Sequence, residues 1–125
     1  MESKYVIDSS IFVAFYYSGD QNHDNAVHIL KSIESHLLVV HPYVISEVAT
    51  VLTYKISKKI ADTFLADIFE AGVAIPIVEI QFETDSFISE NKKMSFTDIT
   101  LVSLAKKINA KLVTFDKQMI SLFRK

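Results

Sequence analysis

Four short apolar segments recur along this chain, and each is too short to form a helix. They occupy residues 5–7, 37–40, 73–78 and 111–115, and longer segments with helically spaced apolar residues separate them. Strands that are apolar on both faces are typical of parallel sheets, because the crossover helices cover both faces of the sheet. The sequence therefore predicts an α/β fold, a three-layer α/β/α sandwich around a central parallel sheet.

The elements between the strands are predicted from apolar residues at helical spacing. Asp8, Ser9 and Ser10 are good helix initiators, Gly72 is a typical C-terminal cap, and Pro76 indicates a strand end or a sheet edge. The predicted helices span residues 11–15, 26–33, 43–56, 60–70, 82–91 and 97–108, and a short final helix extends from residue 116 to residue 123.

The composition fits a single compact domain covering residues 1–125. Half of the residues are apolar, two are Gly, two are Pro, and none is Cys. The absence of cysteine excludes disulfides, cysteine-based zinc sites, iron–sulfur clusters and thiol nucleophiles. No signal-length segment follows Met1, and no apolar run approaches the ~18 residues needed to span a bilayer. We therefore expect a soluble cytoplasmic protein without a membrane partner.

Three aspartates stand where predicted strands end or helices begin. Asp8 and Asp116 follow the first and last strands, at the sheet edge where α/β folds bind ligands. Each also has a simpler interpretation as a helix N-cap, and Asp98 could belong to a capping box with Ser95. Asp98, however, heads the apolar face of its helix, which carries Leu101, Val102 and Ala105. A residue that binds a metal at the floor of a pocket must point inward, along the apolar face of its helix. A residue that only caps a helix at the surface need not point inward.

Glu47 is the acidic residue that is hardest to explain structurally. Almost all of its neighbours from residue 44 to residue 52 are apolar, and Val44 and Val51 share its helix face. A partly buried carboxylate is costly without a partner, and no Lys or Arg stands three or four residues away. Its partner must come from elsewhere in the fold or be a metal ion.

Asp8, Glu47, Asp98 and Asp116 would repel one another at a single sheet edge unless a cation held them. Oxygen ligands favour hard cations such as Mg²⁺ or Mn²⁺, which activate water and stabilise charge on a phosphodiester. The formal net charge of −2 by itself argues against nucleic-acid binding. The argument no longer holds if these four acids are metal ligands, because a metal would then offset their charge. Lysine clusters at residues 55–59, 92–93 and 106–111 could then contact phosphate, although solvated helix ends explain each cluster more simply.

These motifs together resemble the PIN domain, the fold of VapC-type toxin ribonucleases, over nearly the whole chain. The matching segments are Tyr5-Val6-Ile7-Asp8-Ser9-Ser10, Ser46-Glu47-Val48, Ser95-Phe96-Thr97-Asp98 and Val113-Thr114-Phe115-Asp116. The resemblance implies a Mg²⁺- or Mn²⁺-dependent endoribonuclease whose catalytic and metal-binding residues are Asp8, Glu47, Asp98 and Asp116.

The resemblance also implies supporting residues and partners. Ser9 and Thr114 match positions where the family often has a small hydroxyl residue, which would hydrogen-bond the acids or a bound water. Many members have a last short strand beyond the position of Phe123, so the sheet is expected to have four or five strands. The expected partners are an RNA substrate, a second copy in a homodimer, and the antitoxin of a type II toxin–antitoxin pair. The high apolar content supports an exposed interface, with candidates at Tyr16, Tyr17, Tyr54, Phe64 and Phe69.

Other functions remain open at this point. Receiver and haloacid-dehalogenase-like domains also place acids at this sheet edge, but the latter needs a second Asp where this chain has Ser10. A receiver needs Lys after its last strand, where this chain has Asp116. A non-catalytic PIN-like binding module and a PIN nuclease that processes RNA without an antitoxin are the remaining alternatives.

The histidines do not form a helical zinc motif. His23, His28, His36 and His41 include no pair at i, i+4 spacing, so surface or capping roles are expected.

Overall fold

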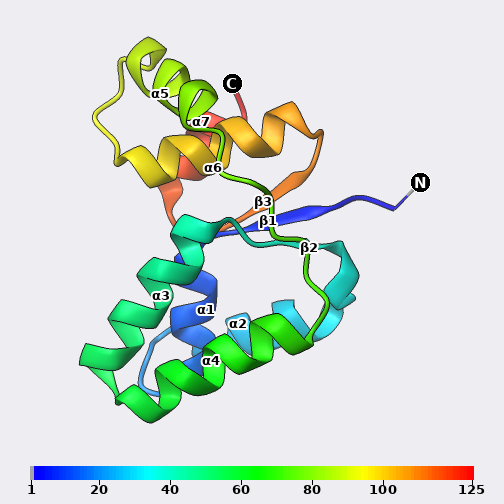
Figure 1. Cartoon of the computed structure of the whole chain (residues 1–125), viewed down its shortest axis with the longest axis vertical. Helices are drawn as coiled ribbons and strands as arrows, with labels where there is room; N and C mark the ends of the chain where they lie inside the picture. The colour runs from blue at the N-terminus through cyan, green and yellow to red at the C-terminus, as the bar shows by residue number, and fades with distance from the viewer. Residues whose placement is uncertain (1) are drawn as a thin grey trace.

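The computed structural model describes residues 2–125 and alternates strands with helices (Figure 1). The strands are β1 (Tyr5–Ile7), β2 (Leu38–Val39) and β3 (Lys111–Val113), and a 3₁₀ helix, η1 (Ser35–Leu37), precedes β2. All seven predicted helices are present, with shifted ends: α1 (Ser9–Tyr16), α2 (His23–Ser32), α3 (Pro42–Lys55), α4 (Lys58–Glu70), α5 (Ile80–Ser89), α6 (Phe96–Lys107) and α7 (Lys117–Phe123).

The sheet is parallel, with strand order β2-β1-β3. Tyr5 of the central strand β1 aligns with Leu38 on one side and with Lys111 on the other. Val6 and Ile7 of β1 are fully buried, since the strand is covered on both faces. The α/β class and the parallel sheet are therefore confirmed.

The expected number of strands is wrong. Of the third predicted strand, residues 73–78, only Ala74 pairs, through a parallel bridge to Val39. Its backbone exchanges hydrogen bonds with Val40 and Leu38, at 2.9 and 2.8 Å. Pro76 has no N–H to donate, so the ladder cannot continue beyond it. The following residues leave the sheet, and the side chain of Ile77 is 86% exposed.

Helices cover the sheet from both sides (Figure 1). α1, α2, α3 and α4 lie on one side, and α5, α6 and α7 lie on the other. Gly72, with φ of 78°, ends α4 as the sequence predicts, because this left-handed conformation costs glycine little.

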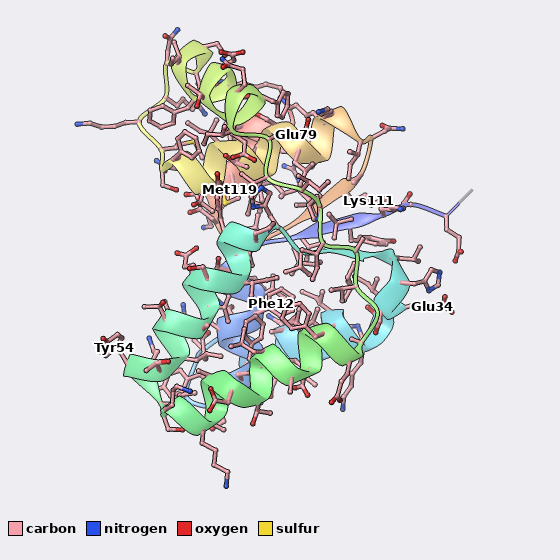
Figure 2. The ribbon with its side chains drawn as sticks, viewed as in Figure 1. Phe12, Glu34, Tyr54, Glu79, Lys111 and Met119 are labelled. Atoms are coloured by element: carbon pink, nitrogen blue, oxygen red, sulfur yellow. The ribbon has the colours of Figure 1, made fainter. Side chains whose placement is uncertain are left out.

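Part of the predicted exposed patch is wrong, because some of its residues pack in the core. Phe64 is fully buried against Phe12, with ring centroids 5.5 Å apart, and Tyr16 and Tyr17 are half-buried. Tyr54 at the end of α3 and Phe69 in α4 are exposed at 87% and 69%. Figure 2 shows Phe12 inside the helical layer and Tyr54 pointing outward.

Among residues 2–125, no helix has the length and apolar character required to cross a membrane.

Candidate active site

A cavity of about 400 Å³, here called the acidic cavity, opens at the carboxyl edge of the sheet. Its acids come from distant parts of the chain: Asp8 follows β1, Glu47 lies in α3, Asp98 lies in the first turn of α6, and Asp116 follows β3. The remaining lining residues are Ser9, Ser10, Val13, Asp20, Asn22, Val51 and Phe115. The fold thus brings all four predicted acids to one cavity.

Asp8 is held by two hydroxyl groups. Its Oδ2 accepts hydrogen bonds from Ser10 Oγ at 2.8 Å and from Thr114 Oγ1 at 2.7 Å. The residue is buried, and although it occupies the N-cap position of α1, its side chain makes no capping hydrogen bond. The capping interpretation therefore does not account for Asp8. Both hydroxyls fix one oxygen of the carboxylate, and no hydrogen bond within residues 2–125 occupies the other.

The ends of β1 and β3 are joined through the same hydroxyls. Thr114 Oγ1 accepts the backbone N–H of Asp116 at 3.0 Å, and Ser10 Oγ accepts that of Phe115 at 3.3 Å. These bonds fix the loop that carries Asp116 relative to Asp8.

Glu47 is exposed, which contradicts the expectation of a partly buried carboxylate. It lies on the wall of the open cavity, while Val44 on the same face of α3 is fully buried. Its Oε1 accepts a hydrogen bond from Ser9 Oγ at 2.6 Å. The partner that the sequence could not identify is thus a hydroxyl at the start of α1.

Asp116 caps a helix and lines the cavity at the same time. Its Oδ1 accepts the backbone N–H groups of Gln118 and Met119 at 2.8 and 3.0 Å, at the start of α7. The capping interpretation is therefore correct for Asp116, and it does not compete with a role in the cavity, because the second oxygen is not used by the cap.

Asp98 has a perturbed acidity. Burial raises the pKa of its carboxyl, and the negative charge of Asp8 raises it further, with smaller contributions from Asp116 and Glu47. The Ser95 hydroxyl, which caps α6 by accepting the Asp98 N–H at 3.0 Å, acts in the opposite direction. The raised pKa thus reflects burial first and repulsion by the neighbouring carboxylates second, and a bound cation would relieve the repulsion.

The donor set fits a hard divalent cation that keeps part of its water shell. The polar side chains that line the cavity are carboxylates, serine hydroxyls and one asparagine amide, and no Lys or Arg lines it. No three of its acids bring their oxygens within 4.8 Å of one another. Mg²⁺ binds in this way, through one or two carboxylates and several waters, so Asp8, Glu47, Asp98 and Asp116 could hold it directly or through water.

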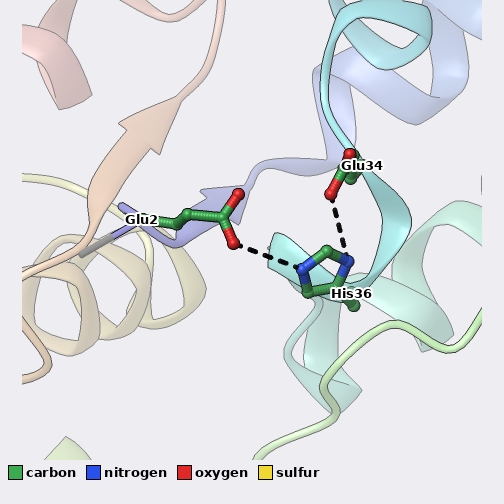
Figure 3. A group of neighbouring side chains, drawn as sticks. All are labelled: Glu2, Glu34 and His36. Carbon is green, nitrogen blue, oxygen red and sulfur yellow. Dashed lines mark ion pairs between the residues drawn. The ribbon is translucent and has the colours of Figure 1, made fainter.

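Within residues 2–125, one other group of potential metal ligands has its ligand atoms closer together than those of the acidic cavity, but it lies at the surface. Glu2, Glu34 and His36 bring their ligand atoms within 4.8 Å of one another and are exposed. Nε2 of His36 faces Glu2 at 3.7 Å and Nδ1 faces Glu34 at 3.5 Å (Figure 3). The carboxylates therefore lie at opposite ring nitrogens, which suits separate surface contacts with each nitrogen and not one shared metal.

Comparison with known proteins identifies the family. The PIN domain model matches residues 5–124. The chain belongs to the PIN domain family. A VapC ribonuclease of Archaeoglobus fulgidus is 29% identical over 123 residues, covering 90% of this chain and 77% of its own length.

Solved structures have the same fold. VapC20 of Mycobacterium tuberculosis, a toxin that cleaves the Sarcin-Ricin loop, superposes with a TM-score of 0.84 at 19% identity and 95% coverage of both chains. FitAcB of Neisseria gonorrhoeae superposes with a TM-score of 0.66 at 9% identity, covering 96% of this chain and 93% of its own. These likenesses establish that the chain has the PIN fold.

Several residues that line this PIN domain's cavity were not predicted as site residues, among them Ser10 and two polar residues of the loop after α1. Asp20 and Asn22 lie in the loop between α1 and α2 and line the cavity. The Asn22 N–H donates to Asp20 Oδ1 at 2.8 Å. The sequence Gly19-Asp20-Gln21-Asn22 indicates only a turn, and nothing in its spacing shows that the turn lines the cavity.

A second buried acid lies outside the cavity. Glu83 of α5 accepts hydrogen bonds from His41 Nε2 at 3.1 Å, Tyr43 OH at 2.5 Å and the Glu79 N–H at 3.0 Å. Burial alone would raise the pKa of Glu83, but these bonds outweigh it and hold the pKa below its ordinary value. Nδ1 of His41 accepts the Tyr43 N–H at 3.0 Å and caps α3, so the expected capping role is confirmed for His41.

Proposed function

We propose that this PIN domain is a metal-dependent endoribonuclease that hydrolyses RNA phosphodiester bonds. Asp8, Glu47, Asp98 and Asp116 would hold Mg²⁺ or Mn²⁺, and the convergence of these four acids in one cavity is the observation that carries the proposal. The metal would supply an activated water and charge stabilisation at the phosphodiester.

The protein's own groups would orient the ligands. Ser10 and Thr114 hold Asp8, and Ser9 holds Glu47, so the carboxylates keep their direction before any metal binds. Asp98, with its raised pKa, would accept a proton most readily when the cavity has no cation, and it would be ionised when a cation occupies the site.

The relatives support a toxin role. One is named a VapC ribonuclease, and another is a toxin that cleaves the Sarcin-Ricin loop. We infer that this protein acts as the toxin of a type II pair, forms a homodimer and is inhibited by an antitoxin. An antitoxin that places Arg or Lys in the acidic cavity would replace the metal's charge and exclude phosphate. An RNA-processing nuclease without an antitoxin is the second candidate, because the same cavity would serve it.

The test is cleavage of single-stranded RNA by the purified chain. Cleavage should require Mg²⁺ or Mn²⁺ and stop with EDTA. A wild-type protein that binds the metal and RNA but releases no product would support the non-catalytic binding module instead.

A further inference from the structure

The acidic cavity cannot by itself attract a polyanion. Five carboxylates line it, from Asp8, Asp20, Glu47, Asp98 and Asp116, and no lysine or arginine does. A bound metal neutralises the reacting phosphate locally, but the phosphates on either side still meet a negative surface. Cations elsewhere must supply the affinity for the rest of an RNA strand.

A cationic groove lies along α7 and the outer edge of β3. Two hollows of about 410 and 390 Å³ lie there and share Ile120 and Arg124 as lining residues. No acidic residue lines either hollow. The other lining residues are Lys111, Leu112, Val113, Thr114, Lys117, Ser121 and Phe123. Figure 2 shows Lys111 at the sheet edge. We call this surface the α7 groove.

The lining residues of the α7 groove and of the acidic cavity are adjacent in the chain at residues 114–117. Thr114 lines the groove, whereas Phe115 and Asp116 line the cavity. Lys117 is the next residue, at the start of α7. A strand that leaves the cavity over Asp116 therefore reaches Lys117 first.

Polar groups of α7 form a line that leads away from the cavity. Lys117, Ser121 and Arg124 stand at i, i+4 and i+7, line the same hollow and are exposed. The helical rise places Lys117 and Arg124 about 10 Å apart along the axis, which allows contact with neighbouring phosphates of one strand.

These cations are not engaged within the protein. Among residues 2–125, neither Lys117 nor Arg124 has a carboxylate within 4.0 Å, whereas Lys58 pairs with Asp62 and Lys107 pairs with Glu79. Unpaired cations in a groove without acids favour a polyanionic ligand, because they lose no existing ion pair on binding.

We propose that the α7 groove binds the backbone of the RNA strand next to the scissile phosphate, with Lys117 and Arg124 each contacting a phosphate. This proposal rests on the proposed function. It identifies the surface along which the RNA substrate would lie. Lys117 and Arg124 act in substrate binding, and Asp8, Glu47, Asp98 and Asp116 act at the reacting phosphodiester.

The experiment compares Lys117→Gln, Arg124→Gln and the double variant with wild type, using a fluorescent single-stranded RNA. Lys59→Gln is the matched control, because Lys59 is an exposed lysine of α4, on the opposite side of the sheet from α7. Cleavage kinetics are measured over a salt series, and RNA affinity is measured with Ca²⁺ in place of Mg²⁺.

The double variant should raise KM and the RNA dissociation constant about tenfold or more, with kcat within about twofold of wild type. Each lost phosphate contact should reduce the slope of log affinity against log salt by about 0.7. Arg124→Lys should keep most of the affinity, since it keeps the charge, and Lys59→Gln should match wild type. A role in folding alone would lower the melting temperature without changing the salt slope.

The outcomes separate the two proposals. If wild type binds RNA through Lys117 and Arg124 but does not cleave it, the nuclease proposal fails and the groove assignment stands. If wild type cleaves RNA and the double variant keeps its KM, affinity and salt slope, the groove assignment is overturned. Weakened binding of an acidic protein partner by that same variant would then assign the groove to the partner.

Discussion

Thr114 donates a 2.7 Å hydrogen bond to Oδ2 of Asp8, across 106 positions of the sequence. The same hydroxyl accepts the Asp116 N–H, so one side chain joins the end of β1 to the loop after β3. Asp8 and Asp116 come from neighbouring parallel strands, and within residues 2–125 Thr114 is the one side chain that hydrogen-bonds both residues, while Ser10 links Asp8 to the Phe115 N–H.

Replacing Thr114 by Val should weaken metal binding and lower the free energy of unfolding by about 1–2 kcal/mol, since Asp8 and the Asp116 N–H each lose a partner. Calorimetric titration with Mn²⁺ and denaturant unfolding measure the two effects. Thr114→Ser keeps the hydroxyl and should stay close to wild type. Equal metal affinity in Thr114→Val and wild type would show that the bond does not orient Asp8.

Asp98→Asn should abolish RNA cleavage and leave the melting temperature of the metal-free protein unchanged or slightly higher. The substitution keeps the shape and removes a carboxyl whose pKa is raised by burial and by Asp8, so it relieves repulsion. Cleavage assays and thermal melting test this, with exposed Asp24→Asn of α2 as the control. Full activity in Asp98→Asn would remove Asp98 from the site.

Addition of Mg²⁺ or Mn²⁺ should raise the melting temperature and support cleavage, because a ligand that binds only the folded state stabilises it by mass action, by about 2.7 kcal/mol at 100 times Kd. EDTA should reverse both effects. Ca²⁺ should stabilise yet catalyse poorly, because its looser coordination positions water less well. Activity that persists after exhaustive chelation would contradict the metal mechanism.

Glu83→Gln should lower the free energy of unfolding at neutral pH by about 2–3 kcal/mol, because Gln cannot accept from His41, Tyr43 and Glu79 together. The pKa of Glu83 is lowered in the folded state, so its stabilisation is present above the ordinary value of 4.5 and is lost as pH falls through the folded pKa. The difference between wild type and Glu83→Gln should therefore shrink below about pH 4.5 in urea unfolding curves.

The control for Glu83 is Asp85→Asn, an exposed acid two residues further along α5, which should match wild type throughout. A Glu83→Gln difference that stays constant down to pH 3 would show that the carboxylate charge contributes nothing.

The proposed homodimer is tested by light scattering. We expect a mass near twice the 14.2 kDa of one chain at micromolar concentration, because exposed side chains such as Tyr54 and Ile77 leave apolar surface uncovered. A strict monomer at high micromolar concentration would contradict the dimer.

The sequence alone determines the local features of this PIN domain. Apolar strands such as Tyr5–Ile7 and helical spacing around Leu101 depend only on neighbouring residues, and so does the position of Asp8 or Asp116 after a strand. Because parallel strand ends share one edge, those patterns also predict that the acids lie together.

Tertiary structure decides whatever depends on distances between remote segments. The third predicted strand, residues 73–78, pairs with the sheet only at Ala74. The loop with Asp20 contributes to the lining of the cavity, and Glu83 contacts His41 across 42 positions. The local sequence around each of these residues is compatible with several partners, and only the packed chain brings a particular donor within hydrogen-bond distance of a particular acceptor, since these bonds form only at specific distances and angles.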